Sequence, residues 1–225
     1  MQYNTETVTR ARKLDIIATN TVIKNTYILL SMTLLFSSLT AYIAMVTRAP
    51  QLGFLPTLLG FFGLSYLTHH LKDSSLGIAA IFAFTGFLGY TLGPLLNAIT
   101  YMYANGSEII AATFGLTGAI FFALSGYALT TRKDFSYLGG FLFVGITVLF
   151  VASLAGIFLN IPALHLATSS GLVLISSGYI LYETSQIIHG GERNYIVATI
   201  SLYVQIYNLF ISLLHILSAF SGRRN

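Results

Sequence analysis

The sequence contains no cysteine, which excludes disulfide bonds and metal sites built on thiolate ligands. Charged residues are also scarce: they make up 8% of the 225 residues, against roughly 25% in an average soluble domain. So few charges cannot cover the surface of a soluble protein, and 55% of the residues are hydrophobic. Most of the surface must therefore face lipid. No polar stretch is long enough to form a second, water-soluble domain.

The chain carries a formal net charge of +4, with its basic residues scattered between apolar segments. This pattern is typical of membrane topology signals and not of a nucleic-acid-binding surface. The first 21 residues are polar, and the apolar run that follows them is longer than the roughly 7–15-residue hydrophobic region of a secretory signal. We expect residues 1–21 to be retained as a short cytosolic tail.

Seven apolar segments come near the roughly 20 residues that a helix needs to cross a bilayer core of about 30 Å. They predict transmembrane helices at Val22–Val46, Leu52–Leu71, Leu76–Tyr101, Glu108–Thr130, Tyr137–Leu159, Ala163–Ile188 and Tyr195–Phe220. The sequence thus predicts an all-α bundle of seven transmembrane helices over residues 22–220, with a short C-terminal tail at 221–225. The second segment is the least regular, because Gly53, Pro56, Gly60 and Gly63 loosen it. It is either a kinked span or a partly re-entrant one.

The basic residues orient this bundle, because Lys and Arg are enriched in cytoplasmic loops. With the N-terminus inside, eight of the 11 basic residues lie on the cytoplasmic side, and Arg48, Arg223 and Arg224 lie on the other. The outer loops around Asn105 and Asn160 contain no basic residue. We expect a cytoplasmic N-terminus and a periplasmic C-terminus, provided that all seven segments span.

Glu183 is the one acidic residue predicted to lie within a span, where an ionisable side chain is costly and by default faces the bundle interior, a partner or water. Ser169, Ser176 and Glu183 recur every seven residues and so lie on one side of the sixth helix. Two interpretations remain open. The stripe is a set of polar contacts between helices, or Glu183 is a protonatable gate or sensor.

A second polar stripe follows the seventh predicted helix with spacings of four, three, four and three residues. We call it the polar seam; its members are Ser201, Gln205, Asn208, Ser212 and His215. Lipid would not tolerate all five side chains, so we expect this helix at the centre of the bundle with the polar seam against other helices. Hydrogen bonds between helices and the lining of a pore or occluded cavity both account for the pattern.

Three glycines in the third predicted helix, Gly86, Gly89 and Gly93, indicate a close contact with another helix. Gly89 and Gly93 form a GxxxG pair, which allows two helix backbones to approach each other. We expect packing within the bundle here and not dimerisation.

No complete catalytic or metal-binding motif occurs. His189-Gly-Gly-Glu192 resembles the start of H-x-x-E-H, but the fifth residue is Arg193 and the two glycines remove the helical ligand geometry. The segment Ala-Leu-Ser-Gly at 123–126 lacks the first glycine of an intramembrane serine protease motif. We expect a protein that is not an enzyme, with no catalytic or metal-binding residue and no cofactor.

Four segments together resemble the BAX inhibitor-1 family, also called transmembrane BAX inhibitor motif proteins. They are Phe84–Leu96, which contains Gly-Tyr-Thr-Leu-Gly-Pro, Leu129–Asp134, Leu181–Gly191, which contains Tyr-Glu-Thr and His-Gly-Gly, and Asn194–Phe210. The resemblance covers the chain from about Lys24 to Ser218. It implies a seven-helix bundle with the last helix at its centre, in agreement with the polar seam.

The resemblance also implies two functions. Bacterial members similar to this chain lie in the inner membrane, bind the membrane protease FtsH, are degraded by it and restrain its activity on other membrane proteins. Other members are pH-sensitive calcium leak channels that use a pair of intramembrane aspartates. By motif, this pair falls on Glu183 and Gln205, and because Gln205 has no carboxylate, two acids sharing a proton are impossible here. We therefore prefer FtsH as the partner and keep a proton or calcium pathway at Glu183 as the alternative.

Overall fold

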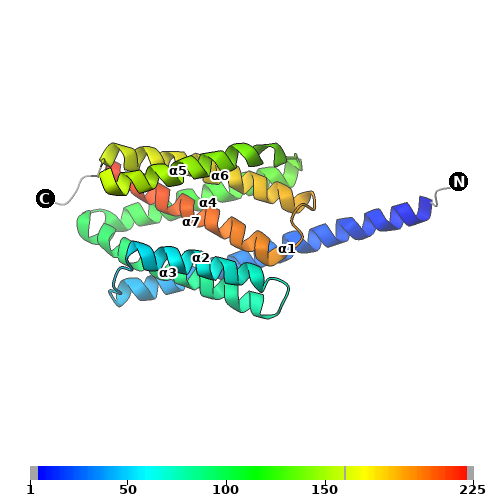
Figure 1. The fold of residues 1–225 in the computed structure, drawn as a ribbon, viewed down its shortest axis with the longest axis horizontal. Helices are drawn as coiled ribbons and strands as arrows, with labels where there is room; N and C mark the ends of the chain where they lie inside the picture. Colours follow the sequence, from blue (N-terminus) through cyan, green and yellow to red (C-terminus); the bar gives the residue numbers. More distant parts are fainter. Residues whose placement is uncertain (1–4, 160, 222–225) are drawn as a thin grey trace.

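The computed structural model describes residues 5–159 and 161–221, which form a bundle of helices (Figure 1). Its elements in chain order are α1 (Thr5–Val46), α2 (Phe54–His70), α3 (Leu76–Met102), α4 (Gly106–Thr131), the 3₁₀ turn η1 (Ser136–Leu138), α5 (Gly139–Leu159), α6 (Pro162–Ile188) and α7 (Tyr195–Phe220). The predicted all-α architecture is confirmed. From α3 onward, the predicted helix ends lie within two residues of the observed ones.

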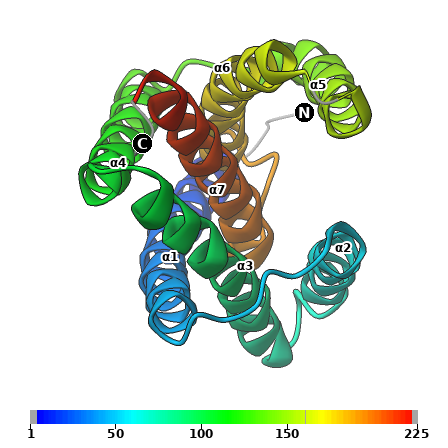
Figure 2. The same ribbon diagram turned by 90° about the vertical axis from the view of Figure 1, so that its left-hand side faces the viewer.

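Helix α7 lies at the centre of the bundle, with α1, α3, α4 and α6 around it (Figure 2). Buried positions make up 67% of its apolar stretch, against 6% of the stretch Ser136–Gly156 that includes α5. Its buried face includes Leu202, Leu209 and Leu214, each fully enclosed by neighbouring helices. The central position expected for the last helix is confirmed.

Helix α3 packs closely on α1 through the three glycines. A Cβ atom on Gly89 would overlap with the Ser37 carbonyl oxygen and the Thr40 side chain, and one on Gly93 would overlap with Ala44. A Cβ on Gly86 would meet the ring of Phe36. Between helices in lipid, van der Waals packing is a main source of association, so this close approach helps to fix α3 against α1.

Helix α1 begins much earlier than the predicted span, at Thr5, and its first turns extend beyond the bundle (Figure 1). The boundary that the sequence suggested at residues 21 and 22 marks no break in the helix. No glycine or proline occurs between Thr5 and Val46, so a helix that forms in the apolar stretch Ile17–Val46 propagates toward the N-terminus. Residues 1–4 of the predicted tail and residues 222–225 of the C-terminal tail lie outside the described residues.

Helix α2 has 17 residues and is shorter than the predicted span Leu52–Leu71. Its length of about 26 Å is close to, but below, a bilayer core of about 30 Å. Pro56 lies in the first turn, where a missing N–H breaks no hydrogen bond of the helix. The other six helices contain apolar stretches long enough to cross a membrane.

Large apolar side chains cover the outer surface of the bundle. On α5 the exposed residues include Phe141, Phe143, Val144, Val148 and Val151. A continuous apolar surface of this kind would cause aggregation in water, whereas lipid covers it without a partner protein. Together with six helices of spanning length, it makes the chain an integral membrane protein.

Candidate functional site: the polar faces of α6 and α7

Glu183 lies in the last two turns of α6, half-buried, next to the buried side chains of Thr184 and Ser185. Its carboxylate makes no hydrogen bond and no ion pair within the described part of the chain. On the same stripe, Ser169 and Ser176 are 5% and 0% exposed, and the Ser176 hydroxyl has no hydrogen-bond partner among the described residues. The two serines of the stripe predicted on α6 are thus buried against the bundle.

The polar seam of α7 is only partly enclosed. Ser212 is buried, Ser201, Gln205 and Asn208 are half-buried, and His215 is exposed. Within the described residues, Gln205 and Asn208 make no hydrogen bond, and the Gln205 Oε1 atom is buried without a partner. No hydrogen bond joins Gln205 to Glu183. Within the described residues, Gln205 and Asn208 thus supply no hydrogen bond across helices, which is one of the two roles that the polar seam allows.

The hydrogen bonds that do join α7 to other helices come from its opposite face, which the sequence analysis missed. The Tyr203 hydroxyl lies 2.5 Å from Ser37 Oγ on α1 and donates to the Thr85 carbonyl on α3 at 3.3 Å. The Tyr207 hydroxyl lies 2.7 Å from Thr91 Oγ1 on α3. One turn earlier, Thr199 Oγ1 donates to the Thr26 carbonyl on α1 at 3.3 Å. The available signal was the four-residue spacing of Thr199, Tyr203 and Tyr207 in the middle of a span.

The turn between α6 and α7 explains the His-Gly-Gly segment. Gly190 has a φ of +74°, a left-handed conformation that glycine adopts without strain, and its N–H donates to the Ile187 carbonyl at 3.3 Å. The Gly191 N–H donates to the Gln186 carbonyl at 2.8 Å, which completes a Schellman cap. The segment therefore ends α6. Among the described residues, no three His, Asp or Glu side chains lie close enough to hold a metal ion.

Asn194 caps α7 and ties it to the loop after α2. Its Oδ1 accepts hydrogen bonds from the N–H groups of Ile196 and Val197 at 2.9 and 3.3 Å, which satisfies free donors of the first turn. Its Nδ2 donates to the Lys72 carbonyl at 3.1 Å and to Asp73 Oδ1 at 2.9 Å. The start of the central helix is thus fixed to the α2–α3 connection.

The other anchor at this end joins α6 to the segment after α4. Ser185 Oγ accepts a hydrogen bond from the Phe135 N–H at 2.9 Å. Next to Phe135, Asp134 Oδ1 accepts a hydrogen bond from the Ser136 N–H at 2.9 Å. This bond to the backbone stabilises the charged form and lowers the pKa of the Asp134 carboxyl below its ordinary value of 3.8.

Three bacterial proteins are similar in sequence to this chain over nearly its whole length. The chain is 54% identical over 203 residues to the "Modulator of FtsH protease YccA" of Escherichia coli K12, an alignment that covers 90% of this chain and 92% of YccA. The same identity and coverage hold for the "Inner membrane protein YccA" of Escherichia coli O6:H1. An uncharacterized protein of Pseudomonas aeruginosa is 53% identical over 201 residues, covering 89% of this chain and 90% of that protein.

A family model covers nearly the whole bundle. The model described as "Inhibitor of apoptosis-promoting Bax1" matches residues 19–222, from the apolar part of α1 to the residues just after α7. The matched region includes Glu183 and Gln205, the polar seam, the glycines of α3 and the turn between α6 and α7. Together with the identity to YccA, this shows that the chain belongs to the family of inhibitors of apoptosis-promoting Bax1.

Proposed function

We propose that this protein binds the protease FtsH in the bacterial inner membrane and restrains its activity on other membrane proteins. The observation that carries the proposal is the 54% identity to YccA, which is named a modulator of FtsH protease, over 90% of this chain. Identity at about half of 203 aligned residues is too extensive to be confined to the buried positions of the bundle. It therefore supports a shared partner and not only a shared fold.

The contact with FtsH has to use faces within the membrane or the first turns of α1, because the described connections between helices are short. Helix α1 extends beyond the bundle at its N-terminal end (Figure 1). We assign this end to the cytoplasm, in line with the basic residues, and the C-terminus to the periplasm. A protease that pulls on its substrates needs a projecting segment to hold, and the first turns of α1 provide one. If this protein is held by that segment and degraded slowly, it occupies the protease and keeps other membrane substrates out.

The test is a degradation assay in proteoliposomes that contain purified FtsH and a membrane protein substrate. Adding this protein at increasing amounts should slow the disappearance of the substrate. A matched variant without residues 5–15 should remain inserted, since the apolar stretch Ile17–Val46 is intact, but it should be degraded more slowly itself. Unchanged substrate degradation, together with no FtsH recovered on the purified protein, would refute the proposal.

A second function, a pH-sensitive cation leak, is kept because of one observation. Glu183 is a half-buried carboxylate in a membrane-spanning helix, with no hydrogen bond or ion pair in the described part of the chain. Such a group is a candidate proton sensor or gate. Against this function stands Gln205, which supplies no second carboxylate. Calcium or proton flux in liposomes that contain this protein alone distinguishes the two functions.

A further inference from the structure

A narrow crevice runs between α1 and α4, with α7 as its floor. Among the described residues, the backbones of α1 and α4 do not pack against each other, although each packs against α7. The cavity has a volume of about 250 Å³, and its lining on α1 extends from Tyr27 to Ala41. At about 1.5 Å per residue, these two positions are about 21 Å apart along the helix. We call this cavity the α1–α4 crevice.

The lining of the α1–α4 crevice is mostly apolar. The rings of Tyr27 and Phe121 meet between the two helices with their centroids 6.2 Å apart. Farther along α4, the Thr117 hydroxyl is buried and has no hydrogen-bond partner within the described residues. Gly118 also lines the crevice, and a Cβ atom there would meet no other atom within 4 Å. The space next to Gly118 is therefore open, and most of its lining is apolar.

The dimensions of the crevice decide what can occupy it. A helix is about 10 Å across, so a cavity of about 250 Å³ that extends along about 21 Å of α1 is too narrow to hold a whole transmembrane helix between α1 and α4. The crevice opens sideways, because Ser31, Ser38 and Phe122 at its mouth are exposed. This mouth is continuous with the lipid-facing surface of the bundle. A single flexible hydrocarbon chain from the bilayer both reaches the crevice and fits in it.

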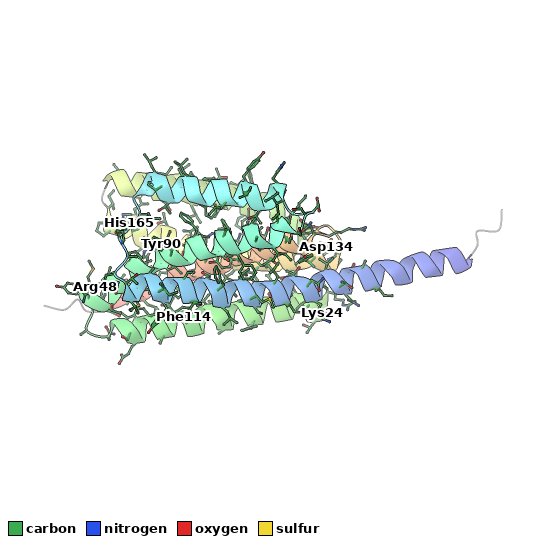
Figure 3. All side chains as sticks on the ribbon, turned by 90° about the horizontal axis from the view of Figure 1, so that it is seen from below. Lys24, Arg48, Tyr90, Phe114, Asp134 and His165 are labelled. Carbon is green, nitrogen blue, oxygen red and sulfur yellow. The ribbon has the colours of Figure 1, made fainter. Side chains whose placement is uncertain are left out.

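Lys24 indicates the charge of the group at the end of that chain. The lining residues of one stripe on α1 repeat every three or four residues: Tyr27, Ser31, Leu34, Ser38 and Ala41. Lys24 does not line the crevice but continues this spacing three residues before Tyr27. The Lys24 side chain is exposed and lies at the end of the bundle opposite Arg48 (Figure 3). A lysine near the end of a membrane-spanning helix extends its ammonium group to the membrane–water interface, where it attracts anionic lipid head groups.

We propose that an acyl chain of an anionic phospholipid occupies the α1–α4 crevice, with its head group at Lys24. Phe114 of α4, which Figure 3 shows far along the bundle from Lys24, lies near the end of the bound chain. This lipid packs between two helices that do not contact each other through their backbones. The bound acyl chain would therefore keep α1 and α4 apart and help to set the distance between them.

The test uses the full-length protein in liposomes with phosphatidylglycerol or phosphatidylcholine that carries a photoreactive diazirine on one acyl chain. After irradiation, labelled residues are mapped by mass spectrometry, and labelling is expected on crevice residues of α1, α4 and α7. Gly118→Leu fills the crevice and should abolish this labelling. The matched control is Gly115→Leu, since Gly115 is also on α4 with open space at its Cβ but does not line the crevice.

A second pair of variants tests the head group. Lys24→Gln should reduce the preference for labelled phosphatidylglycerol over phosphatidylcholine about fivefold, because one lysine near an anionic surface contributes a factor of that size. Lys72→Gln, at the same end of the bundle but in the α2–α3 connection, should leave the preference unchanged.

Three results would overturn the proposal. They are crevice labelling that survives Gly118→Leu, equal crevice labelling by the two lipids, and no crevice labelling at all, as expected if a second copy of the chain covers the mouth.

Thr117→Val is the variant for the case in which Gly118→Leu does not fold, because it changes one hydroxyl to a methyl of similar size. It should retain or raise the labelling, and a loss of labelling would mean that the occupant is not a simple hydrocarbon chain.

Discussion

The hydroxyl groups of Tyr203 and Ser37 lie 2.5 Å apart in the bundle interior, and their hydrogen bond joins the central helix α7 to α1. Tyr203 is 2% exposed and Ser37 is 5% exposed, so neither hydroxyl has water as an alternative partner. The Tyr203 ring also stacks on Tyr207, with 6.3 Å between centroids. This face of α7, and not the polar seam, holds the central helix in place.

Tyr203→Phe should therefore lower the free energy of unfolding by about 0.6–2 kcal/mol, the range measured for hydrogen bonds between membrane helices. The ring and its stacking remain, so insertion should be unaffected. Unfolding in mixed micelles measures the effect, and a double-mutant cycle with Ser37→Ala isolates the pair. A coupling energy near zero in this cycle would contradict the assignment. Gln205→Leu is the control, and it should cost less, since Gln205 makes no hydrogen bond in the described part of the chain.

The two faces of α7 show which features of the bundle the sequence could predict and which it could not. The ends of α3 to α7 were predictable because local breakers such as Asn105-Gly106 and Gly190-Gly191 end each apolar run. The central position of α7 was predictable because its polar residues exclude lipid on one side. Which of the two polar faces of α7 forms hydrogen bonds to other helices was not predictable. This depends on which neighbouring helix places a hydroxyl group at the same depth in the bundle. Ser37, Thr85 and Thr91 are brought to α7 by the packing of α1 and α3, which periodicity does not encode.

The early start of α1 was missed for a different reason. The polarity of residues 1–21 indicated a cytosolic tail outside the membrane, and polarity does not tell whether such a tail is helical. Helix propagation from an adjoining span needs no apolar face, only the absence of breakers. For the candidate site, the sequence places Glu183 and Gln205 within spans. Their lack of hydrogen bonds within the described residues became visible only with the neighbouring helices in place.

Whether α2 crosses the membrane decides the side on which the C-terminus lies. Because the chain has no cysteine, single cysteines report on either end of α2 without further changes. Gln51→Cys and Ser75→Cys place a thiol at exposed positions before and after the helix. We expect a membrane-impermeant maleimide added from the periplasmic side to label position 51 and not position 75. A reporter fused to Asn225 should be active on the periplasmic side. Labelling of both positions from one side would mean that α2 is re-entrant and that the C-terminus is cytoplasmic.

Asp134 should make stability depend on pH at the acidic end. Its pKa is lower in the folded protein than in the unfolded chain, so its contribution to stability is fully present above the ordinary value of 3.8 and is lost as the pH falls through the lower, folded value. Asp134→Asn should therefore lower stability near pH 7 by the amount that the wild type loses below pH 4 or so, and flatten that acidic limb. Both effects should be small, because the group is exposed. The thermal midpoint, measured from pH 2 to 7, checks this. A wild-type acidic limb retained in the variant would assign the pH dependence to another group.

Glu183 and Gln205 allow the two candidate functions to be separated in one chain. Glu183→Gln keeps the shape of the side chain and removes its charge. If Glu183 only fills space on α6, this variant should retain the insertion, stability and FtsH binding of the wild type. If Glu183 is a proton sensor, the same variant should flatten any pH dependence of ion flux. The reverse change, Gln205→Asp, adds a second carboxylate on α7, which packs along α6.

The variant Gln205→Asp is the sharper test, because it supplies the second carboxylate that a pair of acids titrating together requires. We expect it to create or strengthen a pH-dependent, cation-permeable state in liposomes, whereas the native chain with one carboxylate should show little flux. Gln205→Asn is the matched control, since it has the length of aspartate without the charge and should leave flux at the native level. Calcium flux that is already strong in the native protein, and indifferent to Glu183→Gln and Gln205→Asp alike, would remove Glu183 from any sensing role. It would also reverse the preference for a protease modulator over a channel.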